Sequence, residues 1–213
     1  MLLQFIRGNA SVFDLLVFVV CVIATITIHE FAHAFRADQA GDPTPRNEGR
    51  VTLNPVAHYD PIGTTMILLM GMGWGRPVMT RPQFYRHPRR DSLMISFWGP
   101  LSNILLAIFT LLLIRFIPYL QDESVPWSHV AWRLAEFNLF LAFFNLIPLY
   151  PLDGSKVLSN LLPIKYATKF DLFTMQYGML ILLLLVFGAS SMIDYWVGIP
   201  SALVIRTVML GVG

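Results

Sequence analysis

The chain has 213 residues, of which 55% are hydrophobic and only 13% are charged. Soluble domains carry roughly a quarter charged residues, and a soluble fold of this length could not bury so much apolar surface. The composition therefore predicts an all-α integral membrane protein, folded as a polytopic helical bundle within the lipid bilayer. The net charge of +2, without a basic stripe interleaved with aromatics, gives no indication of a nucleic-acid partner. The single cysteine excludes a disulfide or a thiolate metal site within one chain.

The first apolar run, residues 15–35, is long enough to cross a hydrocarbon core about 30 Å thick. Its C-terminal half carries the motif His29-Glu30-x-x-His33. Residues four apart share one face of a helix, so the two histidines can offer their imidazole nitrogens to one metal ion. Glu30 lies about 100° further round, where it can act on a water molecule at that metal. A run that carries this chemistry is not expected to be a cleavable signal peptide.

The segment between the first two clear spans has a different character. Residues 36–61 contain many turn signals, and residues 50–54 and 75–80 are expected to be short extended pieces. Residues 62–74 are apolar but rich in glycine and short for a spanning helix. We expect a short membrane-associated β element or a re-entrant segment here, with residues 62–74 entering and leaving by the same face.

Four further apolar runs follow, at residues 93–117, 130–149, 172–197 and, more weakly, 199–212. Residues 118–129 are expected to be an acidic loop and residues 155–171 a basic loop. His58, His87 and His129 are expected to be ordinary interfacial histidines. The spans are expected to form one polytopic domain over residues 1–213.

Basic residues in short loops predict the orientation. Residues 36–91 contain eight arginines, residues 118–129 contain no lysine or arginine, and residues 153–172 contain three lysines. By the positive-inside rule the first and third of these segments face the cytoplasm, provided that residues 62–74 do not cross. The histidine motif and Asp153 then both lie near the cytoplasmic leaflet, and the N-terminus faces outward.

A catalytic zinc ion needs a third protein ligand besides His29 and His33. Asp153 is the best candidate, because it lies in an apolar segment, broken by Pro148 and Pro151, on the same side of the membrane. A carboxylate left unpaired there is costly, and binding a dication removes that cost. The sequence thus predicts one zinc ion per chain.

These motifs, in this order, resemble the site-2 protease family of intramembrane zinc metalloproteases. The resemblance rests on the HExxH motif, on Gly99-Pro100-Leu101-Ser102-Asn103, and on the run from Asn145 to Leu152-Asp153-Gly154. It is closest to a compact prokaryotic branch without PDZ or CBS domain, which implies a prokaryotic cell membrane. It implies His29, His33 and Asp153 as zinc ligands, Glu30 as the catalytic residue, and Asn145 as a residue that holds substrate or the oxyanion.

Two asparagines keep alternative interpretations. Asn103 could donate to the oxyanion, or merely hydrogen-bond between helices as asparagines in membranes commonly do. Asn145 could equally satisfy backbone carbonyls that Pro148 leaves free.

The expected reaction is metal-assisted hydrolysis of a peptide bond in the transmembrane segment of a membrane protein substrate. Such a helix must unwind first, and the extended pieces near residues 51–54 and Val78 could offer it a strand edge. A non-proteolytic metal-binding transporter or scaffold is the alternative from another class. A membrane peptidase that acts on lipid-modified or loop peptides is a third.

Overall fold

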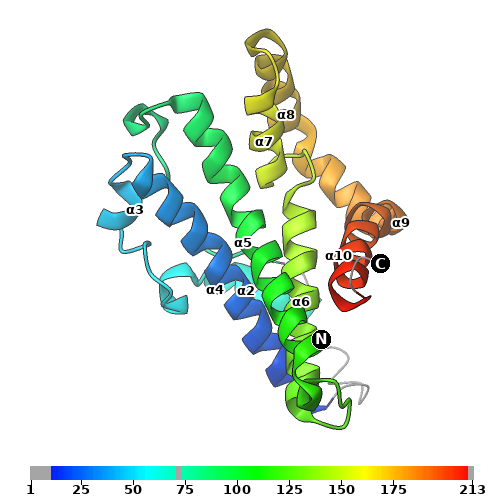
Figure 1. The fold of residues 1–213 in the computed structure, drawn as a ribbon. Helices are drawn as coiled ribbons and strands as arrows, with labels where there is room; N and C mark the ends of the chain where they lie inside the picture. The colour runs from blue at the N-terminus through cyan, green and yellow to red at the C-terminus, as the bar shows by residue number, and fades with distance from the viewer. Residues whose placement is uncertain (1–10, 71–72, 211–213) are drawn as a thin grey trace.

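The structure is a computed structural model that describes residues 11–70 and 73–210. Five long helices set the architecture (Figure 1): α2 (Val12–Gln39), α5 (Pro88–Phe116), α6 (Pro126–Asn145), α8 (Ile164–Gly188) and α10 (Ile199–Leu210). The shorter helices are α3 (Thr44–Asn47), α4 (Pro61–Met70), α7 (Asp153–Leu161) and α9 (Ser190–Ile193). Three single 3-10 turns, η1 (Pro55–His58), η2 (Pro82–Phe84) and η3 (Pro118–Leu120), and a π-helical turn, η4 (Asp194–Gly198), complete the described chain.

Within the described residues, four helical stretches are long and apolar enough to cross a membrane, namely Val12–Gln39, Pro88–Phe116, Ile164–Gly188 and Ser191–Leu210. The predicted all-α polytopic membrane architecture is thereby confirmed. The predicted span at residues 130–149 forms α6 but is not among these four. It carries Arg133, Glu136 and Asn138, which lower its hydropathy. Helices α2, α5 and α10 pack around it, so part of its polar surface is shielded from lipid.

Local capping chemistry explains where the long helices begin. Helix α2 starts earlier than predicted because Ser11 caps it: the Asp14 N–H donates to the serine hydroxyl at 3.1 Å, and the Ser11 N–H donates to the Asp14 carboxylate at 2.9 Å. Helices α5 and α6 begin with Pro88 and Pro126, at the position where a missing N–H costs nothing. Helix α6 ends at Asn145, just before Pro148, which cannot continue a helix.

Two predictions between the spans are wrong. Most of residues 155–171 are helical, split between α7 and the start of α8, and only residues 162–163 connect the two helices. No strand occurs in residues 11–70 and 73–210, so the extended pieces at residues 50–54 and 75–80 form no β element. The backbone donors near Val78 are taken singly: Arg76 N–H donates to the His58 carbonyl at 2.8 Å, and Val78 N–H to the Glu30 carboxylate at 3.1 Å. These single bonds are not a ladder between two strands.

Helix α4 bears on the re-entrant alternative. It has ten residues and is therefore about 15 Å long, half of a hydrocarbon core. Within its described residues it is too short to cross, as the re-entrant interpretation of residues 62–74 requires. Residues 71–72 of that segment lie outside the described residues.

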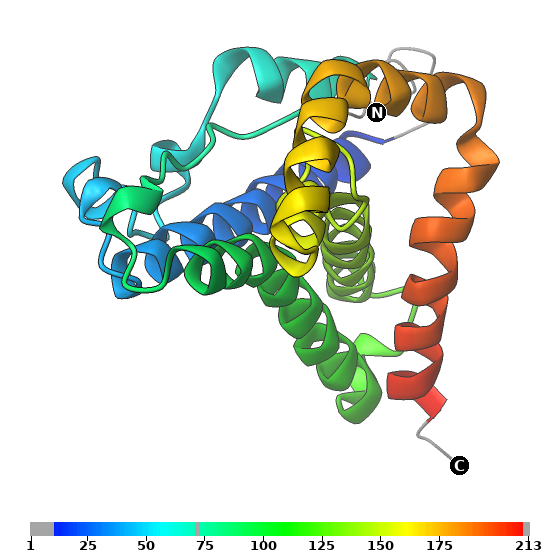
Figure 2. The ribbon, with the colours of Figure 1, turned by 90° about the horizontal axis from the view of Figure 1, so that it is seen from above.

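Helices α2, α5 and α6 pack side by side and form the core of the molecule. One buried cluster joins α5 and α6 and is made of Ala107, Leu111, Ile114, Ala135 and Leu139. Its alanines let the two backbones approach closely, as small residues do between membrane helices. Helix α10 packs on the same cluster, whereas α8 leads away from the bundle (Figure 2).

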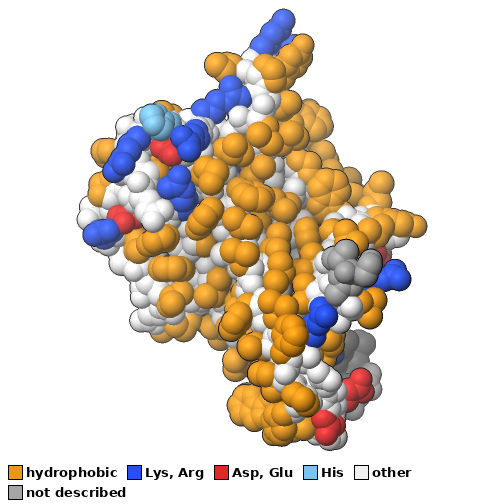
Figure 3. All heavy atoms as spheres, viewed as in Figure 1, with side chains coloured by type: hydrophobic (Ala, Val, Ile, Leu, Met, Phe, Trp, Pro, Cys, Tyr) orange, Lys and Arg blue, Asp and Glu red, His pale blue; other side chains and the backbone are white. Residues whose placement is uncertain are grey.

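The surface is divided by residue type. Hydrophobic side chains cover the length of the bundle, while the largest group of lysines and arginines lies at one end, over α3, the start of α5 and the tip of α7 and α8 (Figure 3). The exposed basic residues there include Arg86, Arg89, Arg90, Lys165 and Lys169. The C-terminal ends of α2 and α6 and the N-terminal end of α5 lie at this end (Figure 1).

Candidate active site

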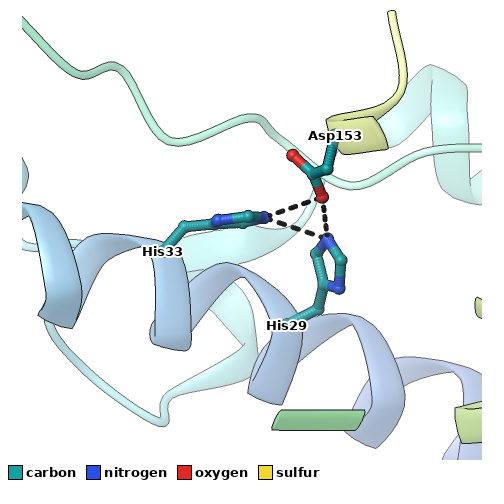
Figure 4. Close-up of side chains that lie close together, drawn as sticks. All are labelled: His29, His33 and Asp153. Atoms are coloured by element: carbon teal, nitrogen blue, oxygen red, sulfur yellow. Dashed lines mark hydrogen bonds and ion pairs between the residues drawn. The ribbon is translucent and has the colours of Figure 1, made fainter. Parts of the chain in front are cut away.

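Three side chains predicted as metal ligands meet at one point. The carboxylate oxygen Oδ2 of Asp153 lies 3.0 Å from Nε2 of His29 and 3.1 Å from Nε2 of His33, and the two nitrogens are 3.1 Å apart. Two of these side chains come from the C-terminal half of α2 and one from the first residue of α7 (Figure 4). Both histidines are buried. The structure thus brings together residues separated by 120 positions in the sequence.

The donor set and its spacing fit a zinc ion. Two imidazole nitrogens and one carboxylate oxygen are a ligand set found in catalytic zinc sites, which keep a fourth position open. Donor atoms held 2.0–2.1 Å from one tetrahedral ion lie about 3.3 Å apart, within a few tenths of an ångström of the separations seen here. All three donor atoms lie within 4.8 Å of one another. This group could therefore hold a metal ion with little rearrangement.

Hydrogen bonds behind the two imidazoles aim their Nε2 atoms at this point. The Nδ1 atom of His33 lies 2.7 Å from the backbone carbonyl of Ile95, and the Nδ1 atom of His29 lies 2.7 Å from Oδ1 of Asn103. Both partners belong to α5. Outer partners of this kind set the tautomer and the orientation of metal-binding histidines. Each Nε2 is then free to act as a ligand.

Gly99 makes room for both imidazoles. A Cβ atom added to this residue would overlap Nε2 of His33 and lie only 2.9 Å from Cε1 of His29. Any side chain at this position of α5 would therefore displace the histidines. The glycine in the Gly99-Pro100 pair has a direct steric role at the site.

Glu30 lies beside the three converging residues and is held by the irregular segment of residues 73–81. The N–H of Val78 donates to Glu30 Oε2 at 3.1 Å. Gly75 permits this approach, since a Cβ there would come within 2.6 Å of Ile26 on α2. Glu30 is consequently fixed by a main-chain donor that comes from another part of the chain.

Two buried side chains support the 73–81 segment from behind. Arg50 is 1% exposed and donates through Nη2 to the carbonyl of Arg76. His58 is 2% exposed, with Nε2 2.9 Å from the Thr52 carbonyl, and its own carbonyl accepts from Arg76. Burial lowers the pKa of His58 from its ordinary value of 6.5. His58 is thus a buried support of this segment, and its position at the membrane interface stays a prediction.

A cavity of about 1060 Å³ opens onto the site. It is bordered by residues of α2, the 73–81 segment, α6 and the C-terminal helices, and most of its wall is apolar. His29, His33, Glu30, Asp153 and Asn145 all line it. Asn145 donates one amide hydrogen to the Leu141 carbonyl at 2.9 Å, and its nitrogen carries a second hydrogen.

Asn103 is placed differently from what an oxyanion donor requires. It is fully buried, and its amide nitrogen donates to the Thr25 carbonyl at 3.0 Å and to Oδ1 of Asn138 at 2.7 Å. Both amide hydrogens are thus committed. The arrangement matches the alternative interpretation, in which Asn103 hydrogen-bonds between helices, and adds a contact to His29.

Sequence reasoning did not identify three contributions to the site. These are the space provided by Gly99, the N–H of Val78, and the amide of Asn138. A signal was present only for Asn138, because an amide in an apolar run needs a partner. Which partner it has depends on how α2, α5 and α6 pack.

The known proteins that the chain matches are named as peptidases or zinc metalloproteases. Residues 119–185 match the model of peptidase family M50. YwhC of Bacillus subtilis is 40% identical over 152 residues, which are 68% of this chain and 68% of that protein. Rip2 of Mycobacterium tuberculosis H37Rv is 30% identical over 183 residues, 83% of this chain and 68% of that protein. MJ0392 of Methanocaldococcus jannaschii, named a zinc metalloprotease, is 27% identical over 186 residues, 86% of this chain and 46% of that protein. No solved structure matches the chain significantly.

Proposed function

Because the chain belongs to peptidase family M50, the site-2 protease family of zinc metalloproteases, we propose that it is an endopeptidase that cleaves the transmembrane segment of a membrane protein substrate. The observation that carries the proposal is the convergence of His29, His33 and Asp153 on a largely apolar cavity that Glu30 also lines. An apolar cavity beside hydrolytic residues suits a substrate that comes from the bilayer.

In the proposed mechanism His29, His33 and Asp153 hold one zinc ion per chain. When bound, zinc polarises the scissile carbonyl and lowers the pKa of water to about 7. The carboxylate of Glu30 accepts the proton of the attacking water and passes it to the leaving nitrogen, as a general base and then a general acid. The Val78 N–H donates to Oε2 of the Glu30 carboxylate. This hydrogen bond keeps the carboxylate in place between the two proton transfers.

Asn145 is proposed to stabilise the oxyanion or to hold the substrate. It lines the cavity together with Asp153, and its amide has one hydrogen beyond the bond to Leu141. A positioned amide donor of this kind contributes about 3 kcal/mol to acyl-transfer reactions. Asn103 has no such role in the proposal, because both of its amide hydrogens are committed.

The unwound substrate is proposed to lie along the 73–81 segment. Pro77, Val78 and Thr80 line the cavity, whereas residues 51–54 do not, so the strand-edge hypothesis now rests on this segment alone. A Met79→Pro substitution removes one N–H of this edge without touching the bond from Val78 to Glu30. Loss of one substrate hydrogen bond should lower cleavage about tenfold while zinc is retained. Unchanged cleavage would remove the edge from the proposal.

The site is proposed to lie near the cytoplasmic leaflet. Support comes from the basic end of the molecule, where α2 and α6 end and α5 begins. A cysteine at Lys165, in a chain whose natural Cys21 is replaced by alanine, should react with a membrane-impermeant maleimide only in inverted vesicles. Labelling of this cysteine from outside the cell would contradict the proposed orientation.

The central experiment is Glu30→Gln in protein purified in detergent with a model transmembrane substrate. We expect zinc to be retained and cleavage to fall by about 10²–10⁴-fold, the usual contribution of a positioned general base. Leu184 on α8, outside both the group that holds the metal and the 73–81 segment, can be replaced by alanine as a control. Full activity of Glu30→Gln, or no cleavage by the wild-type protein, would favour the non-proteolytic transporter or scaffold. Mapping the cleaved bond separates a transmembrane cut from a cut in a loop or lipid-modified peptide.

A further inference from the structure

A chain of buried amides runs from His29 across three helices. Oδ1 of Asn103 on α5 faces Nδ1 of His29, and the amide nitrogen of Asn103 donates to Oδ1 of Asn138 on α6 at 2.7 Å. The amide nitrogen of Asn138 donates in turn to the Thr25 hydroxyl on α2 at 3.0 Å. Asn103 and Asn138 are both 0% exposed.

We propose that Asn138 is a positioning residue for the metal site: through Asn103 it holds the His29 imidazole with Nδ1 protonated and Nε2 turned to the metal. The inference rests on the proposed metal site but not on proteolysis. Asn138 touches neither the metal ligands' converging atoms nor the cavity wall. Asn138 also bonds to Thr25 on α2, but it reaches the His29 imidazole itself through Asn103.

Two backbone carbonyls determine which way each amide points. A carbonyl can only accept, so the atom of Asn103 that faces the Thr25 carbonyl must be the nitrogen. The same holds for the atom of Asn138 that lies 2.8 Å from the Leu134 carbonyl. Oδ1 of Asn138 is then left for Asn103, and Oδ1 of Asn103 is left for His29. Because an oxygen faces Nδ1 of His29, that nitrogen must carry the proton.

The reversed orientation of the Asn103 amide shows why Asn138 matters. If the amide of Asn103 turned over, its nitrogen would face Nδ1 of His29 and its oxygen would face the Thr25 carbonyl and Oδ1 of Asn138. Nδ1 would then have to accept, the proton would move to Nε2, and that nitrogen could not bind a metal. Without Asn138, only the Thr25 carbonyl would oppose this turn. With Asn138 in place, the turned state also sets two amide oxygens against each other in a buried site, which is costly.

The two histidines differ in how they are held. His33 donates directly to the Ile95 carbonyl, which no side chain can change. His29 depends on side chains from two other helices, one of which, α6, also carries Asn145 into the cavity. A small shift of α6 would therefore affect the metal site through His29 and leave the contact of His33 intact.

The test measures zinc affinity of the purified full chain by competition with a chelator, without any substrate. Asn138→Leu keeps the side-chain volume but removes both ends of the relay, and it should weaken zinc binding by about 10–100-fold, the usual effect of an outer-shell partner. Thr25→Val leaves Asn138 bound to the Leu134 carbonyl and should cost less than Asn138→Leu. Asn138→Asp, as the protonated acid, keeps an oxygen toward Asn103 and a donor toward Thr25, and should restore most of the affinity.

Ser128→Ala is the matched control. Ser128 lies on the same helix, is 1% exposed, and donates to the Leu120 carbonyl far from the site. It should leave zinc affinity unchanged although it removes a buried hydrogen bond. Equal zinc affinity in Asn138→Leu and wild type, or an equal loss in Ser128→Ala, would overturn the proposal.

A second measurement reads the tautomer itself. The ¹⁵N imidazole shifts of the zinc-free protein should show one histidine, absent in a His29→Gln variant, that is protonated at Nδ1 in the wild type. In Asn138→Leu this signal should shift toward a mixture of tautomers, and in Thr25→Val, which keeps the bond from Asn138 to the Leu134 carbonyl, it should shift less. If the wild type binds no zinc, the proposed function fails while this measurement still decides the relay. An unchanged tautomer in both variants would overturn it.

Discussion

The two halves of the chain use their apolar residues in opposite ways. In the most apolar stretch of α5, 39% of the residues are buried within the protein, against 6% in the corresponding stretch of Ser191–Leu210. Helices α2, α5 and α6 enclose alanines, one leucine–isoleucine cluster and a set of polar side chains. Helices α8 and α9 and the stretch around α10 present large apolar side chains outward, among them Leu180, Leu184, Phe187, Tyr195 and Leu203.

This difference shows where sequence changes should matter. Among the buried polar residues of the first half, Asn103 and Asn138 each hydrogen-bond to a partner on another helix. An unsatisfied amide would be costly there, so the packing of these helices and the geometry of the site depend on each other. In the second half the exposed apolar surface suits lipid, and its exact side chains are less constrained.

The largest effect is expected at Asp153, the candidate metal ligand that α7 brings to the two histidines of α2. Asp153→Asn removes the proposed anionic ligand but keeps the shape of the side chain. Zinc affinity should fall by more than about 100-fold, beyond the cost of outer-shell changes, and cleavage should fall with it. Metal content of the purified variant and chelator competition measure this, and Asp171→Asn, on α8, is the control. Wild-type zinc content in Asp153→Asn would exclude this residue as a ligand.

Gly99→Ala tests whether space, and not only ligand identity, defines the site. The added methyl overlaps the His33 imidazole and should reduce both zinc affinity and cleavage by about 10–100-fold, as a misplaced ligand does. Gly188→Ala at the end of α8 is the matched control, since nothing lies within 4 Å of a Cβ there. If the two alanine variants behave alike, the steric role of Gly99 is refuted.

Leu139→Ala tests the packing of the first half. Leu139 is fully buried between α5 and α6. Truncation leaves a cavity and should lower the free energy of unfolding by about 2–5 kcal/mol, because packing contacts rather than water exclusion hold membrane helices together. Reversible unfolding in mixed micelles measures the change. A loss below about 0.5 kcal/mol, the level of an ordinary surface change, would contradict the assignment of a close-packed core.

The smallest effect is expected in the second half. Leu184 on α8 is 61% exposed, and Leu184→Ala should change the free energy of unfolding by less than about 0.5 kcal/mol in the same assay. Zinc content and cleavage should stay at the wild-type level. A destabilisation equal to that of Leu139→Ala would mean that another protein surface, and not lipid, covers α8.

The features that the sequence predicts correctly are those that depend on neighbouring residues. The HExxH spacing places His29 and His33 on one helix face, and long apolar runs identify the helices. The predictions fail where hydrogen bonding is between segments: residues 50–54 and 75–80 have the composition of strands, yet their backbone donors find single partners such as the Glu30 carboxylate. The composition of residues 155–171, which include three lysines, predicts a loop, although most of this segment is helical.

The amino-acid sequence alone determined the class of this protein, its membrane helices and the residue types of its candidate metal ligands, because composition and helical periodicity are properties of neighbouring residues. It also predicted Asp153 as the third metal ligand, because a carboxylate left unpaired in an apolar segment is costly. Only the tertiary structure decided that this carboxylate lies 3.0 Å from His29, that Gly99 leaves room for the imidazoles, and that Asn138 stands behind Asn103. These relations depend on how α2, α5, α6 and α7 pack, and packing is set by contacts between residues that are far apart in the chain.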